Sequence, residues 1–90
     1  MTGAERAVFR KEANGIEPIL HIGKDDLTDA VVKQADEALE ARELIKATVL
    51  RTCDTPVKAI AEELAKRTDA ECIQVIGRRF VLYRKKKEED

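Results

Sequence analysis

Apolar residues recur at helical spacing in two stretches of the chain. Between residues 28 and 41 the polar side carries mainly carboxylates, and the apolar stripe consists of Val31, Val32, Ala35, Ala38 and Leu39. A second stripe runs to about residue 67 and consists of Val57, Ile60, Ala61, Leu64 and Ala65. Both patterns predict amphipathic helices. Thr28 is the expected N-cap of the first helix, and Thr55-Pro56 supply the expected N-cap and first residue of the second.

Short runs of β-branched and aliphatic residues predict four strands, over residues 19–22, 44–50, 72–76 and 80–84. Gly77-Arg78-Arg79 separates the last two runs and is typical of a hairpin turn. The last two strands are therefore expected to be antiparallel, with arginines at the turn between them.

A further helix is predicted over residues 4–13, which are rich in Ala, Glu, Arg and Lys. Asn14-Gly15 is expected to end it, because both residues tolerate the left-handed cap conformation, and Pro18 then starts an extended segment. The resulting order, α-β-α-β-α-β-β, predicts an α+β fold in one compact domain. We expect a four-stranded mixed sheet packed with helices, whose first β-α-β unit is a right-handed parallel crossover.

The chain length and composition fit a single domain. The 90 residues are 43% hydrophobic and 39% charged, with a net charge of −1, so neither wholesale disorder nor a whole-chain basic character is indicated. We assign residues 2–87 to the domain and residues 88–90 to a frayed acidic end. No apolar run approaches membrane-spanning length and no secretory leader is recognisable, which predicts a cytoplasmic protein without a membrane partner.

The charge is unevenly distributed along the chain. Residues 25–45 carry a net charge of −5, whereas residues 1–24 carry +1 and residues 72–90 carry +3. Between Ile76 and Lys87 there are six basic residues and no acidic one. A polyanion could therefore meet one face of the domain and avoid the acidic segment.

The residues that usually carry catalysis or bind metals are scarce. The chain has no serine and a single histidine, His21, and the two cysteines Cys53 and Cys72 have no CxxC spacing. Asp25-Asp26 fits a solvated turn. We therefore predict no catalytic residues, no metal site, no cofactor and no disulfide.

Two features could bind a polyanion, and each has a structural alternative. Gly23-Lys24 follows a strand and leads into a helix, where backbone N–H groups and the helix dipole attract anions, although it could simply turn the chain. Arg78 and Arg79, with Arg84 and the lysines after it, could contact phosphates, although basic residues also protect sheet edges. The acidic helix 28–41 could instead dock on a basic protein partner.

Several short motifs, taken in order, resemble the CRM domain, which is named for chloroplast RNA splicing and ribosome maturation. They are Phe9-Arg10 with Ala13, Pro18-Ile19, Ile22-Gly23-Lys24, Leu27-Thr28, Ala38-Leu39-Glu40, Glu43-Leu44-Ile45-Lys46, Gln74-Val75-Ile76-Gly77 and Val81-Leu82-Tyr83-Arg84. The similarity covers about residues 2–87 and is strongest to the stand-alone bacterial YhbY-like members.

The resemblance implies a non-catalytic RNA-binding domain with a core similar to the C-terminal domain of bacterial translation initiation factor three. It also implies association with precursors of the large ribosomal subunit, and hence with 23S ribosomal RNA. The GxxG loop of the family, comparable to that of KH domains, falls on residues 23–26, but the fourth position is Asp26 instead of glycine.

Together these observations predict one cationic face that binds ribosomal RNA, with no small-molecule substrate and a monomeric protein. Its expected residues are Arg6, Arg10, Lys11, Gly23, Lys24, Lys46, Arg78, Arg79 and Arg84. Lys24 and Arg78 are expected to be exposed, so that replacing them should leave the fold intact. The alternative function is a protein-interaction module that uses the acidic helix 28–41.

Overall fold

The helices and strands follow one another in the predicted order. The computed structural model describes residues 1–86. Its elements are α1 (Gly3–Ala13), β1 (Leu20–Ile22), α2 (Asp29–Arg42), β2 (Leu44–Val49), α3 (Val57–Thr68), β3 (Glu71–Ile76) and β4 (Arg79–Tyr83). Residue 87 and the predicted frayed end, residues 88–90, lie outside the described residues.

The four strands form one mixed sheet in the order β1-β2-β4-β3. β1 and β2 are parallel, with Leu20 opposite Ala47, as expected for strands joined through a helix. β4 is antiparallel to both of its neighbours, which confirms the predicted hairpin. Arg79 was expected in the hairpin turn but is the first residue of β4, because it pairs with Ile76 on one side and Thr48 on the other.

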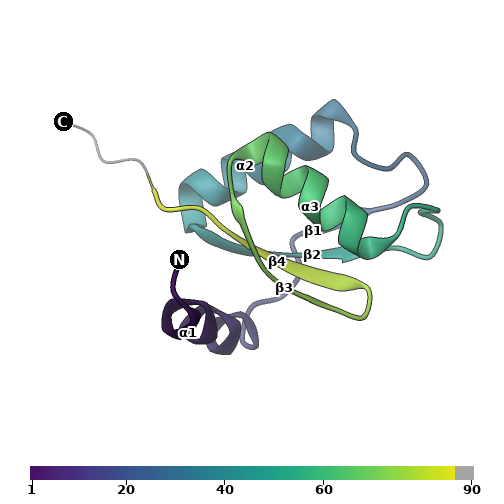
Figure 1. Cartoon of the computed structure of the whole chain (residues 1–90). Helices are drawn as coiled ribbons and strands as arrows, with labels where there is room; N and C mark the ends of the chain where they lie inside the picture. The colour runs from purple at the N-terminus through teal and green to yellow at the C-terminus, as the bar shows by residue number, and fades with distance from the viewer. Residues whose placement is uncertain (87–90) are drawn as a thin grey trace.

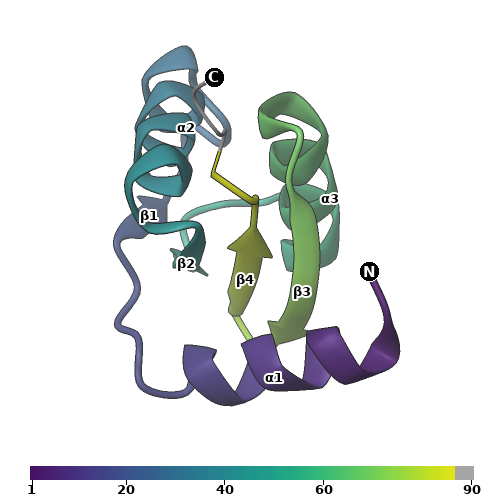
Figure 2. The ribbon, with the colours of Figure 1, turned by 90° about the vertical axis from the view of Figure 1, so that its left-hand side faces the viewer.

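Helices cover the two faces of the sheet unequally. α2 and α3 lie side by side over one face, α2 above β1 and β2 and α3 above β3 and β4 (Figures 1 and 2). α1 lies on the other face and contacts β2 and β3 near one end of the sheet. No helix within residues 1–86 covers the remainder of that second face.

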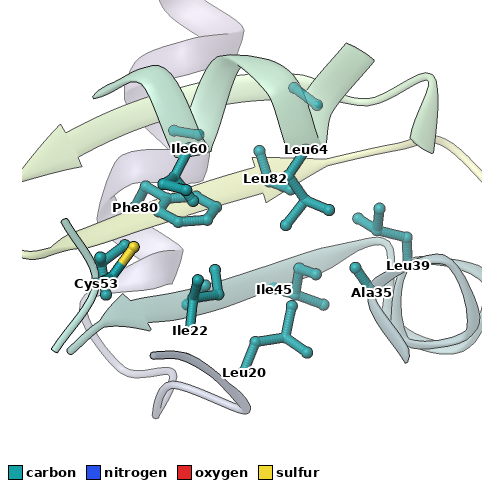
Figure 3. Packing of buried hydrophobic residues seen from close by; sticks show 14 residues of the cluster. Leu20, Ile22, Ala35, Leu39, Ile45, Cys53, Ile60, Leu64, Phe80 and Leu82 are labelled. Atoms are coloured by element: carbon teal, nitrogen blue, oxygen red, sulfur yellow. The ribbon is translucent and has the colours of Figure 1, made fainter. Parts of the chain in front are cut away.

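The main core lies between the sheet and the pair α2 and α3. Both predicted amphipathic stripes point into it, as Figure 3 shows for Ala35 and Leu39 from α2 and for Ile60 and Leu64 from α3. Phe80 is fully buried at its centre. Burial of a side chain of this size is worth about 1.5–3 kcal/mol, so this cluster supplies most of the driving force for folding.

A smaller core holds α1 against the second face. Phe9 stacks on Tyr83 with ring centroids 4.1 Å apart, and the residues packed around this pair are Ala13, Ile16, Leu44, Ile73 and Val81. Both aromatic rings are therefore used for packing. Beyond this cluster, Lys46 and Thr48 of β2 alternate with fully buried residues and point out of the uncovered part of the face.

The ends of α1 differ from the prediction. The helix begins at Gly3 because Thr2 is its N-cap, with a complete capping box in which the Thr2 hydroxyl accepts from the Glu5 N–H. It ends at Ala13 as predicted, but the predicted left-handed conformation of the cap residue is wrong. Asn14 is right-handed, with φ −60°, and its N–H bonds back to the last turn.

The start of α3 also differs. Pro56 is the N-cap, and no side chain caps the helix. Thr55 was expected in that role, but its hydroxyl donates instead to the Asp26 carboxylate, 29 residues earlier in the chain. A long-range contact thus takes the side chain that local sequence assigns to capping.

None of the helices described in residues 1–86 is long and apolar enough to cross a membrane.

Candidate nucleic-acid interface

The uncovered part of the sheet carries three adjoining hollows. One lies against the end of α1, between Asn14, Lys46 and Gln74. A second lies beside it and includes His21 and Thr48, and a third extends toward Leu50 and Arg51 beyond the end of β2. Arg79 lines all three, so it is at the centre of this surface, which we call the open sheet face.

Strand pairing explains why these side chains lie together. His21 is opposite Thr48, Thr48 is opposite Arg79 and Arg79 is opposite Ile76, which makes one row across all four strands. Side chains of directly paired residues point to the same face of a sheet. Lys46, Val81 and Gln74 form a second row nearer to α1.

The open sheet face is cationic. Its basic residues are Lys46, Arg51, Arg78 and Arg79, whereas Glu17 is the one carboxylate among the residues that line the three hollows. Neither Lys46 nor Arg79 forms an ion pair with any residue from 1 to 86. The local charge is therefore positive although the chain as a whole is slightly acidic.

α1 turns a basic side toward this surface. Arg6 contacts β3 and Asn14 lines two of the hollows, and Arg10 lies between them at spacings of four residues, on the same side of the helix. Lys11 is two residues beyond Phe9, which corresponds to about 200° around the helix, so it points away from the sheet. Arg10 therefore flanks the open sheet face, whereas Lys11 does not.

The acidic side of α1 faces the opposite way. Burial raises the pKa of Tyr83, and the carboxylates of Glu43, Glu5 and Glu12 raise it further. Tyr83 is at the end of β4 that lies away from the hairpin turn. Glu5 and Glu12 of α1 therefore lie near that end of β4, as does Glu43 at the C-cap of α2.

Arg6 has a structural role. Its Nη1 donates to the carbonyl oxygens of Cys72 and Ile73, at 2.6 and 3.3 Å, and Nη2 lies 3.6 Å from the Glu71 carboxylate. The register of β3 against β4 shifts between Cys72 and Gln74, which marks a β-bulge. Arg6 therefore stabilises carbonyl groups at this bulge on the edge of the sheet.

Arg78 supports the hairpin. Its Nε donates to the Val49 carbonyl at 2.8 Å, and Nη2 donates to the Leu50 carbonyl at 2.6 Å. The residue is exposed as expected. However, replacing Arg78 would also remove two hydrogen bonds that join the hairpin turn to the end of β2. This geometry does not support the expectation that replacing Arg78 leaves the fold intact.

Two of the predicted site residues, Arg6 and Arg84, form ion pairs within residues 1–86, and Arg84 is the more buried of the two. Its side chain is 13% exposed and lies between α2 and the end of α3. Nη1 donates to the Asp36 carboxylate at 2.6 Å and to the Thr68 carbonyl at 2.8 Å, and Nη2 lies 3.3 Å from Glu40. These contacts are on the far side of the sheet from the open face.

The loop after β1 approaches the open sheet face from one end. A Cβ atom on Gly23 would lie 3.3 Å from the Thr52 hydroxyl and 3.6 Å from a Leu50 methyl group, so only a small residue fits comfortably. Leu50 also receives the Arg78 hydrogen bond. Lys24 is exposed. The loop and the hairpin turn are therefore joined through the segment that follows β2, at the same end of the molecule (Figure 1).

Asp26 stands at the position of the last glycine of the family loop. Its backbone keeps the left-handed conformation that glycine favours. Its φ is +61°, in the left-handed region. One carboxylate oxygen accepts from the Leu27 N–H at 2.6 Å, and the other accepts from the Thr55 hydroxyl. The side chain thus satisfies an N–H group of the loop just before the N-cap of α2, which is then not free to bind a phosphate.

Asp26→Asn is expected to raise affinity for RNA by up to about fivefold at low salt, because it removes a negative charge two positions along the chain from Lys24. Asparagine tolerates a positive φ, so the loop conformation should persist. Fluorescence anisotropy with a labelled RNA measures the change. Thr55→Val is the matched control, because it removes the hydrogen bond between Thr55 and Asp26 and keeps the charge of Asp26. Equal affinities for Asp26→Asn and the wild type would contradict a role for this charge.

Sequence reasoning did not identify several polar members of the open sheet face. They are Asn14, His21, Thr48, Arg51 and Gln74. The alternation of buried and exposed residues in β1 and β2 places His21 and Thr48 on the same side as Lys46, and this signal was present in the sequence. Asn14 joins them only because α1 packs across the sheet, and Gln74 joins them through the register of β3 after its bulge; the local pattern specifies neither.

The remaining reactive groups are separate from this surface. Cys53 is buried and Cys72 is half-buried, and both are free thiols. Burial raises the pKa of Cys72, while nearby Arg6 opposes the shift. Within residues 1–86, no group of three or more His, Cys, Asp or Glu side chains is arranged to hold a metal ion.

The fold and the open sheet face together define a small α+β domain with one cationic sheet surface. The chain belongs to the CRS1 / YhbY (CRM) domain family, whose sequence profile matches residues 1–84. Family membership thus confirms the resemblance drawn from the sequence motifs.

Several relatives of the chain are named for RNA binding. It is 41% identical over 88 residues to the Probable RNA-binding protein YqeI of Bacillus subtilis, covering 98% of this chain and 92% of that protein. It is 35% identical over 86 residues to the Probable RNA-binding protein MJ0652 of Methanocaldococcus jannaschii, covering 93% of this chain and 63% of that protein.

A solved structure has the same fold. The solution structure of SAV1595 from Staphylococcus aureus, described as a candidate RNA-binding protein, superposes with a TM-score of 0.82 at 41% identity. The match covers 100% of this chain and 94% of that one. This similarity confirms the predicted single α+β domain with three helices and a four-stranded mixed sheet.

Proposed function

We propose that this protein binds ribosomal RNA in precursors of the large ribosomal subunit and assists their assembly without catalysing a reaction. The observation that supports this proposal best is the convergence of Lys46, Arg78 and Arg79 on one sheet face that α1 flanks with Arg10. Contacts from such groups to phosphates give affinity and orientation. We further propose that the protein acts as a monomer in the cytoplasm.

Of the predicted site residues, we retain Arg10, Gly23, Lys24, Lys46, Arg78 and Arg79 as the RNA-binding set. We assign Arg6 and Arg84 to the fold, since backbone carbonyls and carboxylates hold their guanidinium groups. Arg78 also donates to backbone carbonyls, but it stays in the set because it is exposed and lines a hollow together with Arg79. We leave Lys11 out of the set, because its position on α1 points it away from the sheet.

The expected signature of this function is a steep dependence of affinity on salt. A labelled fragment of 23S ribosomal RNA is titrated at several salt concentrations, and log K is plotted against log salt. Lys46→Met should reduce the magnitude of the slope by about one, because one phosphate contact is lost. A flat response of the wild-type protein to salt would count against the proposal.

The acidic helix offers less support for a protein-docking function. Two of its carboxylates, Asp36 and Glu40, are partly neutralised by Arg84 within the domain. Nuclease treatment distinguishes the two functions: co-sedimentation with ribosomal particles should disappear after RNA digestion if RNA is the ligand. Retention of the protein on nuclease-treated particles would favour docking through α2.

A further inference from the structure

The open sheet face combines charge with exposed apolar surface, which phosphate contacts alone do not require. Ile76 is 61% exposed and Leu50 is 40% exposed, and both line the hollow that also contains Arg79. Ile76 also lines the hollow next to α1. Exposed apolar residues beside cationic ones favour a ligand that has both anionic groups and flat apolar parts.

The polar groups on this face are suited to the bases of RNA. Gln74 and Asn14 are amides that can both donate and accept hydrogen bonds, and they line the same hollow. His21 and Arg79 belong to the row that crosses the four strands, and imidazole rings and guanidinium planes are surfaces on which unpaired bases stack. Phe9 and Tyr83 are stacked on each other beneath α1, so neither ring supplies a stacking surface here.

The shape of the surface also favours an unpaired strand. α1 stands above one end of the sheet face, and helices are about 10–12 Å across, so a rigid duplex resting on α1 would be held away from Gln74 and Val81. A flexible single strand can enter the space beside α1 and place its bases on the two rows of side chains.

We propose that the open sheet face binds unpaired nucleotides by their bases, with Gln74 and Asn14 contacting base edges and with His21 and Arg79 stacking on base planes. This inference rests on the proposed RNA-binding function and specifies its substrate as single-stranded segments or loops. The cationic residues around the face then hold the phosphates of the same segment.

The test compares a 12-nucleotide single-stranded RNA without self-complementarity and the blunt duplex of the same sequence, at one salt concentration. The duplex has twice the phosphates, so purely electrostatic binding favours it. We expect the wild-type protein to bind the single strand about fivefold more tightly or better. Gln74→Ala should lower this single-strand preference about fivefold, which corresponds to the loss of one hydrogen bond.

Gln34→Ala, at an exposed position of α2, is the matched control and should leave both affinities unchanged. Thermal unfolding verifies that Gln74→Ala folds normally. Equal or weaker binding of the single strand by the wild type, or an unchanged preference in Gln74→Ala, would overturn base recognition and leave RNA binding intact. Failure to bind either RNA at low salt would overturn the proposed function itself.

Discussion

Arg84→Ala is expected to lower the free energy of unfolding by about 2 kcal/mol. The substitution removes hydrogen bonds to the Asp36 carboxylate and to the carbonyls of Asp36 and Thr68, at 2.6, 3.0 and 2.8 Å. Asp36 and Glu40 are about half exposed, so the ion pairs themselves contribute little. The main cost comes from the Thr68 carbonyl and from packing lost between α2 and α3.

Denaturant titration measures this effect as a shift of the unfolding midpoint. Arg84→Lys should recover only part of the loss, because an ammonium group cannot reproduce the planar fork that reaches both helices. Arg67→Ala removes an exposed i,i+4 pair with Glu63 and should cost about 0.5 kcal/mol or less. If Arg84→Ala were as mild as Arg67→Ala, Arg84 would not hold the two helices together.

Arg79→Glu should lower affinity for RNA at least tenfold. Arg79 lines all three hollows of the open sheet face and has no ion-pair partner among residues 1–86. Its reversal removes a cation and places a carboxylate beside Lys46, so every phosphate near the centre of the surface is affected. A single good arginine contact is worth about 1–3 kcal/mol, and the added repulsion increases the loss.

Arg67→Glu is the matched control for this charge reversal, because Arg67 is on α3, which covers the opposite face of the sheet. It changes the net charge of the protein by the same amount. Anisotropy titrations of both variants with one RNA separate a local effect from a general one. Equal losses in the two variants would show that the position of the charge is unimportant.

The fold was largely predictable because its elements are specified locally. The apolar stripes of α2 and α3 and the strand runs are present in the sequence; the stripes lie in the main core, and the strands contribute to both cores. The capping box of α1 was also readable, since Thr2 and Glu5 have the required spacing. The β-bulge in β3 was not, because it depends on a contact with Arg6, which is 66 residues away from Cys72.

The candidate site was less predictable for a physical reason. Arg6, Arg10, Arg79 and Arg84 have the same chemistry in the sequence, and only the packed structure shows which guanidinium groups meet carbonyls. Backbone carbonyls hold Arg6 and Arg84, whereas Arg79 points from the middle of an uncovered sheet face. The family motifs indicated RNA binding but could not distinguish arginines that hold the domain together from arginines that face outward.

The hydrogen bond from Thr55 to Asp26 has a consequence for the energetics of recognition. It ties the loop that bears Lys24 to the residue before the N-cap of α3, while the Leu27 N–H fixes the other carboxylate oxygen of Asp26. The Asp26 N–H also donates to the Gly23 carbonyl, so the loop is already ordered in the free protein. Its engagement by a partner therefore costs little conformational entropy, and this pre-organisation offsets part of the electrostatic penalty of having an acid there.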